Sequence, residues 1–126
     1  MEYDFFPSSF GPPVAEFSSG FEAIGDWMSN DIGADAHVID QLLTMIEQLE
    51  NRQKLEHEFI SAQYVLHMDQ HEVELKFKYD AQYSAQLTAE EEHIMSIENG
   101  AGCGLTDLKI ALQKWREYIM ESRSAL

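Results

Sequence analysis

The stretch HEVELKFKY, residues 71–79, decides the fold class because its apolar and polar side chains alternate strictly. A period of two residues is that of a β-strand, and this alternation is typical of an antiparallel sheet with one buried and one solvated face. The predicted buried set is Val73, Leu75, Phe77 and Tyr79, and the predicted solvated set is Glu72, Glu74, Lys76 and Lys78.

Two further strand candidates precede this one, LEHEFIS at 55–61 and AQYVLHM at 62–68. The polar segment DQHE at 69–72 lies between the second and third candidates and predicts a tight hairpin turn. The sequence from Lys54 onward therefore predicts three consecutive antiparallel strands.

Upstream of these strands the apolar period is 3.6 residues, which predicts a helix at about 35–52. Asp35 is suited to cap its first turn, and NDIG at 30–33 separates it from earlier structure. The apolar stripe consists of Ile39, Leu42, Leu43, Ile46 and Leu49, and the opposite face carries Asp40, Gln41, Glu47 and Glu50.

The N-terminal third predicts a hairpin and a short helix. Strands at 2–6 and 13–18 flank a segment rich in proline and glycine, which predicts a loose turn. Ser19 and Glu22 have the spacing of a capping box for the helix that follows. Gly25 weakens this helix by about 1 kcal/mol relative to alanine, which indicates that another backbone packs closely there. The apolar helical positions are Phe21, Ile24, Trp27 and Met28.

The C-terminal part predicts a loop and a final helix. Residues 80–102 are interpreted mostly as a loop, with HIMSI at 93–97 as a possible short strand. A helix is predicted at about 107–122, with Thr106 as its N-cap and the glycines of GAGCG, residues 100–104, giving the backbone freedom to enter it. Leu105 and Ile110 would form a hydrophobic staple. The apolar helical positions are Leu108, Ala111, Leu112, Trp115 and Ile119.

These elements predict an α+β fold, in which an antiparallel sheet of about five strands packs against about three helices on one face. The chain has 126 residues, 44% of them hydrophobic, so we expect one domain spanning 1–126 with a single core. Trp27 and Trp115 lie on apolar helix faces and are predicted to belong to that core.

The charge balance restricts the partners. The chain has 23 acidic and 8 basic residues, a formal net charge of −15, so we expect neither direct nucleic-acid binding nor attraction to anionic membranes. One cysteine cannot form an internal disulfide, the N-terminal sequence MEYDFF is unlike a signal peptide, and no apolar run approaches about 18 residues. We therefore expect a cytoplasmic protein that favours a basic protein surface.

Cys103 is the one candidate nucleophile, and two interpretations of it are open. Placed before a helix, its thiolate would be favoured by the unpaired N–H groups of the first turn, and it would be a reactive thiol. Catalysis would also require a base, and His93 is the nearest histidine in the sequence. The surrounding acidic residues would raise the pKa of the thiol, so we favour a packing role.

No catalytic residue, cofactor site or metal site is predicted. His67, Asp69 and His71 cluster at the predicted hairpin, and His57 lies on a neighbouring strand. Zinc needs three or four converging ligands, and side chains spread around a turn do not provide them. The glycines of GAGCG lack the lysine of a phosphate-binding loop.

Four stretches resemble the YacL family of small, acidic, uncharacterised bacterial cytosolic proteins. They occur in family order and together extend over nearly the whole chain. The resemblance implies a single cytosolic domain and a partner in the transcription machinery, and it implies no catalytic residue. The stretches are MEYDF at 1–5, FSSGFEAIGDW at 17–27, AQYVLHMDQHEVELK at 62–76 and CGLTDL at 103–108.

We therefore expect a non-enzymatic interaction or regulatory module that docks on a basic protein surface, in the transcription machinery or on another nucleic-acid enzyme. The alternatives are an enzyme or small-molecule binder with a pocket near Cys103, and a homodimer formed through an open sheet edge. The acidic residues proposed for contact with a partner are Glu47, Glu50, Glu90, Glu91 and Glu92.

Overall fold

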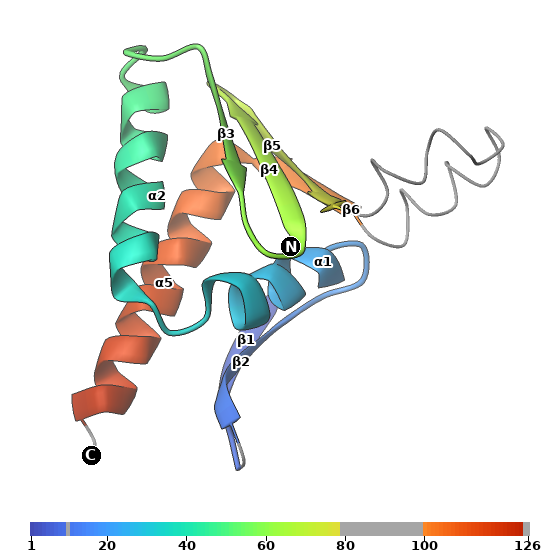
Figure 1. Cartoon of the computed structure of the whole chain (residues 1–126), viewed down its shortest axis with the longest axis vertical. Helices are drawn as coiled ribbons and strands as arrows, with labels where there is room; N and C mark the ends of the chain where they lie inside the picture. The colour runs from blue at the N-terminus through green and yellow to red at the C-terminus, as the bar shows by residue number, and fades with distance from the viewer. Residues whose placement is uncertain (10, 79–99, 125–126) are drawn as a thin grey trace, which may run out of the picture.

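The computed structural model describes residues 1–9, 11–78 and 100–124 (Figure 1). Within these residues the fold is α+β, as predicted, with six strands in two antiparallel sheets. The strands are β1 (Tyr3–Ser8), β2 (Gly11–Phe17), β3 (Glu56–Ile60), β4 (Tyr64–Asp69), β5 (Glu72–Phe77) and β6 (Gly100–Gly104). The helices are α1 (Glu22–Asp26), the π-helix η1 (Trp27–Ile32), α2 (Ala36–Glu50) and α5 (Leu105–Ser124).

The four-stranded sheet has the order β3-β4-β5-β6 and is antiparallel throughout. Helices α2 and α5 contact each other and lie side by side along one face of this sheet (Figure 1). The prediction of helices on one face of an antiparallel sheet is confirmed for these elements.

The three predicted strands and the turn between β4 and β5 are also confirmed. Asp69 Oδ1 accepts hydrogen bonds from the backbone N–H groups of His71 and Glu72, both at 2.7 Å. These two bonds, the one from Glu72 first, lower the pKa of Asp69. On β5, Val73 and Leu75 are buried, as the alternation predicted.

The structure divides the strands between two sheets, with six strands where about five were predicted. The β1–β2 hairpin forms a separate sheet that packs on α1, and a sixth strand, β6, joins β5. The open edge of β2 is closed at Ala15, whose N–H donates to Ser29 Oγ at 2.8 Å and whose carbonyl accepts from it at 3.2 Å. Because that edge is occupied by a side chain, the hairpin cannot extend the larger sheet there.

The predicted entry into the last helix is also wrong. Residues 100–104 pair with β5 as strand β6, and α5 begins at Leu105, so Thr106 lies inside the helix. Leu105 is 2% exposed and Ile110 is 41% exposed, so the two do not form the predicted staple. The boundary was misplaced because a strand made largely of glycine has no side-chain periodicity to detect.

At the N-terminal end the capping box is absent. Helix α1 begins at Glu22 after Phe21, and no side chain caps it. Instead the Phe21 N–H donates to the Ser18 carbonyl, while the Ser18 hydroxyl accepts from the Glu2 N–H. The strands of the hairpin run further than predicted, through the prolines, because an edge strand tolerates a missing N–H donor.

The helical segment continues into the predicted break at 30–33 as η1, which ends at Ile32. Asp35 then caps α2, accepting from the N–H groups of His37 and Val38, as predicted. Gly33 has φ 59°, a left-handed value that favours glycine, and its carbonyl accepts from Trp115 Nε1 at 2.9 Å.

The core lies between the sheet and the helices, and both tryptophans are fully buried in it, as predicted. Gly25 packs against β2, so that a Cβ there would lie 2.8 Å from the Ala15 carbonyl oxygen. The predicted close approach of another backbone is therefore confirmed. The predicted short strand at 93–97 lies outside the described residues.

Candidate functional site

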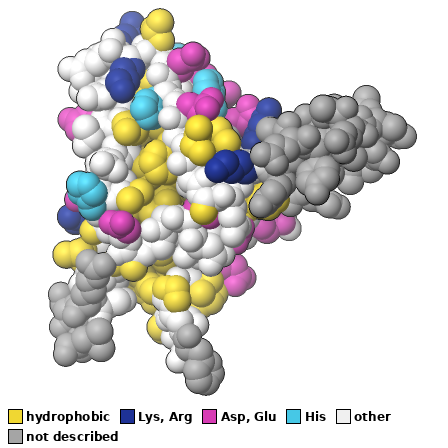
Figure 2. Space-filling model, viewed as in Figure 1, with side chains coloured by type: hydrophobic (Ala, Val, Ile, Leu, Met, Phe, Trp, Pro, Cys, Tyr) yellow, Lys and Arg dark blue, Asp and Glu magenta, His cyan; other side chains and the backbone are white. Residues whose placement is uncertain are grey.

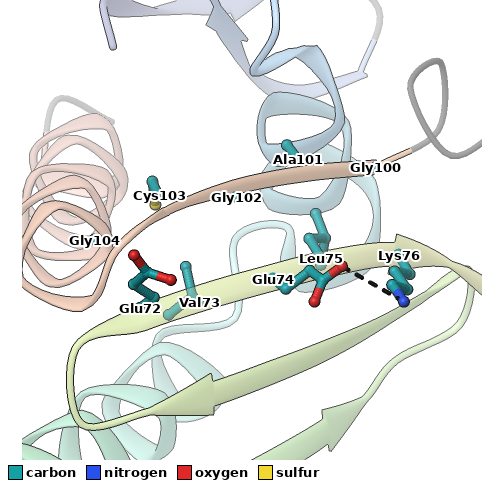
Figure 3. Close-up of a pocket in the computed structure, with 10 residues that line it drawn as sticks. All are labelled: Glu72, Val73, Glu74, Leu75, Lys76, Gly100, Ala101, Gly102, Cys103 and Gly104. Carbon is teal, nitrogen blue, oxygen red and sulfur yellow. Dashed lines mark ion pairs between the residues drawn. The ribbon is translucent and has the colours of Figure 1, made fainter.

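The outer face of β5 and β6 carries an unusual row of glycines. Antiparallel register places Gly104 opposite Glu72, Gly102 opposite Glu74 and Gly100 opposite Lys76. Side chains alternate along a strand, so these glycines share the face of the exposed β5 residues. The result is a shallow depression of about 520 Å³ with bare backbone along β6 (Figure 3).

Among the described strands β6 is the last of its sheet, and the backbone of these glycines faces its outer edge. The Leu105 N–H donates to the His71 carbonyl at 2.9 Å, which continues the β5–β6 ladder by one pair. Because hydrogen-bonded pairs alternate in an antiparallel ladder, Cys103 and Ala101 bond to β5. The N–H and C=O groups of Gly102 and its two neighbouring glycines in the row therefore point away from β5.

Carboxylates predominate around this depression. Glu72 and Glu74 are exposed on β5, and Asp107 in the first turn of α5 lies beside Gly104. Lys76 is the one lysine or arginine among the lining residues, and its Nζ lies 3.5 Å from Glu74 Oε1. Both side chains of this pair are about 60% exposed, so their mutual attraction is weak.

Cys103 is half-buried on the inner side of β6, opposite Val73, and packs against the core. Burial first, and then the charge of Asp107, raises the pKa of its thiol from 9.0 to about 11. The N-terminal ammonium acts in the opposite sense but does not outweigh them. A thiol with this pKa is almost entirely protonated at neutral pH and is therefore a poor nucleophile. His93, its predicted base, lies outside the described residues.

Of the acidic residues predicted for partner contact, Glu47 and Glu50 do not line the depression. Glu47 and Glu50 lie on α2, and Glu50 Oε1 accepts from Lys109 Nζ at 2.8 Å. This hydrogen bond is the main cause of the raised pKa of Lys109. The other predicted residues, Glu90, Glu91 and Glu92, lie outside the described residues.

The histidines near the β4–β5 hairpin have separate surroundings. The Nε2 of His67 is 3.4 Å from Glu56 Oε2, whereas His57 has its pKa lowered by burial first and by Lys54 second. In the part of the chain that the structure describes, no three His, Cys, Asp or Glu side chains are grouped to hold a metal ion.

A polar network that was not predicted joins η1 to the β3–β4 turn. Asp31 Oδ2 accepts from the hydroxyl of Ser61 at 2.5 Å and from the N–H groups of Gln63 and Tyr64 at 2.8 and 3.2 Å. The Tyr64 hydroxyl donates to Asp26 Oδ2 at 2.7 Å. The sequence around Asp31 predicted only a helix break, because the partners lie about thirty residues away along the chain. These contacts position elements of the fold.

Acidic side chains are scattered over the described surface. Figure 2 shows acidic side chains at several separate places on one face, with apolar side chains gathered toward the hairpin. No helix among the described residues is long and apolar enough to cross a membrane. Fold and composition together define a small acidic α+β protein whose larger sheet ends, among the described strands, in the glycine-rich strand β6.

Comparison with known proteins assigns the chain to a family. The profile of the Uncharacterised protein family (UPF0231) matches residues 1–119, and the chain belongs to this family. The resemblance to the YacL family is thereby confirmed.

Individual relatives match over nearly their whole length. A UPF0231 protein of Proteus mirabilis is 32% identical over 123 residues, covering 98% of both chains. Another from Shewanella sp. strain ANA-3 is 30% identical over 127 residues, covering 98% of this chain and 100% of the relative. A third, from Photorhabdus laumondii, is 26% identical over 126 residues. No solved structure gives a significant match.

Proposed function

We propose that this protein is a cytoplasmic interaction module that docks on a basic protein surface without catalysing a reaction. This proposal rests on the location of the acidic side chains. In the described part of the chain, Ser29 is the one buried polar residue, so the acidic side chains there are at least partly in contact with solvent. A net charge of −15 then acts outward on the surroundings.

An acidic surface of this kind favours a partner that itself binds nucleic acid. Such enzymes carry basic grooves for the phosphate backbone, and an array of carboxylates can occupy the same groove. The family resemblance points in the same direction, toward the transcription machinery or another nucleic-acid enzyme. Electrostatic attraction would speed the encounter and make binding sensitive to salt.

The alternative function uses the depression near Cys103 for chemistry or for a small ligand. The raised pKa of the thiol and its position on the inner side of β6 argue against a nucleophile. The depression itself has Glu72 and Glu74 as exposed walls, which disfavours phosphorylated ligands. We therefore place docking first.

The test is affinity capture from native cells on protein immobilised through a C-terminal tag. Captured proteins are identified by mass spectrometry after washing at about 0.1 M and at about 1 M salt, between which the Debye length falls from about 10 Å to about 3 Å. We expect captured proteins with basic surfaces that are lost at high salt, and that are displaced by added duplex DNA.

Two sets of variants complete this test. Neutralising Glu47, Glu90, Glu91 and Glu92 to glutamine should reduce capture, whereas Cys103→Ser should leave it unchanged. Partners retained equally at both salt concentrations, or partners without basic surfaces, would contradict the proposal. Loss of capture in Cys103→Ser would favour the alternative function.

A further inference from the structure

We propose that the open edge of β6 binds an extended, basic segment of the partner, which joins the sheet as an additional strand. This inference rests on the proposed function and names the surface that would perform it. The glycine row of β6 would supply the backbone contacts, and Glu72 and Glu74 on β5 would receive the basic side chains.

The first argument is the unpaired backbone of β6. The ladder register directs the N–H and C=O groups of Gly102 and its neighbouring glycines toward the open edge. Outside the β5–β6 ladder, no backbone hydrogen bond among the described residues involves Gly102. Gly102 is also exposed. An incoming strand can pair with such groups, as in the addition of a peptide to a sheet edge.

The second argument is that β6 itself lacks the charged and proline residues that protect the edges of many sheets. The edge of β2 is closed by the Ser29 hydroxyl, and β3 at the other side of the large sheet carries Glu56 and Glu58. Strand β6, GAGCG, has no charged side chain and no proline. Glycine inside a strand also costs stability, and it often marks a place where another backbone approaches closely.

The third argument is the reach of basic side chains. Neighbouring strands lie about 4.8 Å apart, so a strand added beside β6 would lie about 10 Å from β5. Because Gly102 has no side chain and no described side chain lies within 4 Å of its Cβ position, a lysine or arginine side chain could cross β6 there. It would then reach Glu72 or Glu74. A short side chain would not extend that far, and an acidic side chain would be repelled by these glutamates.

Charge selects this occupant over a second copy of the chain. Two molecules that each carry a charge of −15 repel one another, while a basic segment is attracted. Three acidic side chains lie around the depression, those of Glu72, Glu74 and Asp107. Among the described lysines and arginines, only Lys76 lines it.

The first test uses a fluorescent peptide of alternating lysine and valine residues, with its binding measured by anisotropy. We expect the Gly102→Pro variant, which removes one edge N–H, to lose about tenfold in affinity, near the upper end for one hydrogen bond. Glu72→Gln combined with Glu74→Gln should lose about threefold, as expected for exposed ion pairs. Glu117→Gln, at an exposed position on α5, is the matched charge control and should change little.

Two modified peptides make the test independent of any damage to the protein. One peptide is N-methylated on its lysine residues and the other on its valine residues, so each blocks a different edge of the peptide strand. Addition to β6 requires one methylated peptide to lose binding and the other to keep it. Equal binding, or equal loss, of the two peptides would overturn the proposal.

Amide hydrogen exchange provides the second test. In the free protein, the amides of Ala101 and Cys103 should be protected and that of Gly102 should exchange quickly. Saturating peptide should protect Gly102 at least about tenfold, as expected for a newly formed hydrogen bond. Protection that appears elsewhere while Gly102 stays unprotected would place the contact on another surface.

The two proposals fail in different ways. If the peptide does not bind, or binds without Gly102 protection, while basic partners are still captured in a salt-sensitive manner, only the edge proposal is wrong. If no basic partner is captured, the proposed function is wrong. Sedimentation that shows a dimer, lost in Gly102→Pro, would assign the edge to a second copy of this chain and overturn the edge proposal.

Discussion

At the scale of single residues, Gly25 has the tightest surroundings of the described glycines. It lies in α1 where the backbone of β2 crosses, and a Cβ there would come within 2.8 Å of the Ala15 carbonyl oxygen. Both contacting groups belong to regular backbone, so neither can move independently. Glycine lowers the stability of helix α1 at this position, but its lack of a side chain lets the hairpin pack against the helix.

Gly25→Ala should therefore destabilise the protein, although alanine is the better helix former. We expect a loss of about 1–3 kcal/mol in the free energy of unfolding, the range for overpacking a core. Urea denaturation measures this, with Gly11→Ala as the control because its nearest atom, Ser8 Oγ, would be 3.8 Å away. Equal stability of the two variants would contradict the packing argument.

Cys103 gives a prediction about pH. Its pKa is raised from 9.0 to about 11 in the folded protein, so the protonated thiol is favoured by folding. The resulting stabilisation is present below 9.0 and is lost as the pH rises toward about 11. The stability of the wild type relative to Cys103→Ala should therefore decrease across this window.

Alkylation gives a direct measurement of the same pKa. In the native state, the rate at which iodoacetamide modifies Cys103 should have its midpoint near pH 11. In urea the midpoint should return to the unshifted value of 9.0. If the alkylation midpoint were lower in the native state than in the unfolded chain, the thiol would be activated, and the alternative enzymatic function would be supported.

At the scale of elements, side-chain periodicity decided what could be predicted from the sequence. Strand β5 and helix α2 have regular apolar patterns, and both were found close to their observed positions. Strand β6 was missed because glycine has no side chain and three of its five residues are glycines. The carboxylates that line the depression were predicted only as the solvated face of β5 and not as site residues, because the register that aligns them with glycines depends on pairing distant in sequence.

Helix starts were harder to predict, because several nearby residues can accept the same backbone N–H groups. Asp35 was correctly identified as a cap, but Ser19 and Thr106 were not caps. In the last case the strand runs directly into the helix, so no free residue precedes it. Tertiary pairing of β6 therefore overrode a local signal that was chemically reasonable.

Matched substitutions test these helix starts. Asp35→Ala should lower the free energy of unfolding by about 1 kcal/mol, because two N–H groups of α2 lose their acceptor. Thr106→Ala should change it by less than about 0.5 kcal/mol, since Thr106 is exposed and lies inside α5. Thermal denaturation of both variants distinguishes the two positions, and equal losses would place a cap at Thr106 after all.

At the scale of the whole molecule, the N-terminal third is fastened to the large sheet by polar contacts as well as by the core. Asp31 and Asp26, from consecutive helical segments, both bind residues at the β3–β4 turn. The Phe5 ring also meets Trp115 edge-on, with centroids 5.1 Å apart. The hairpin, its helices and the sheet are therefore connected at several points.

Asp31→Ala should weaken this connection substantially. It removes the carboxylate that accepts from the Gln63 and Tyr64 N–H groups, and we expect a loss of about 3 kcal/mol, because hydrogen bonds to a charged group are among the stronger ones. Glu58→Ala on exposed β3 is the control and should change stability by less than about 0.5 kcal/mol. Urea denaturation compares them, and a similar small change in both would show that the network is not important for stability.

The position of β6 in the chain also bears on the order of assembly. Strands β4 and β5 are joined by a two-residue turn, whereas the whole segment 78–99 separates β5 from β6. Contacts between distant residues form more slowly than local ones, so β3, β4 and β5 should pair first during refolding. Pulse labelling would then find the Ala101 and Cys103 amides protected later than those of β4. Strand β6, which is expected to complete the sheet last, is thus also the strand that we propose to pair with the partner.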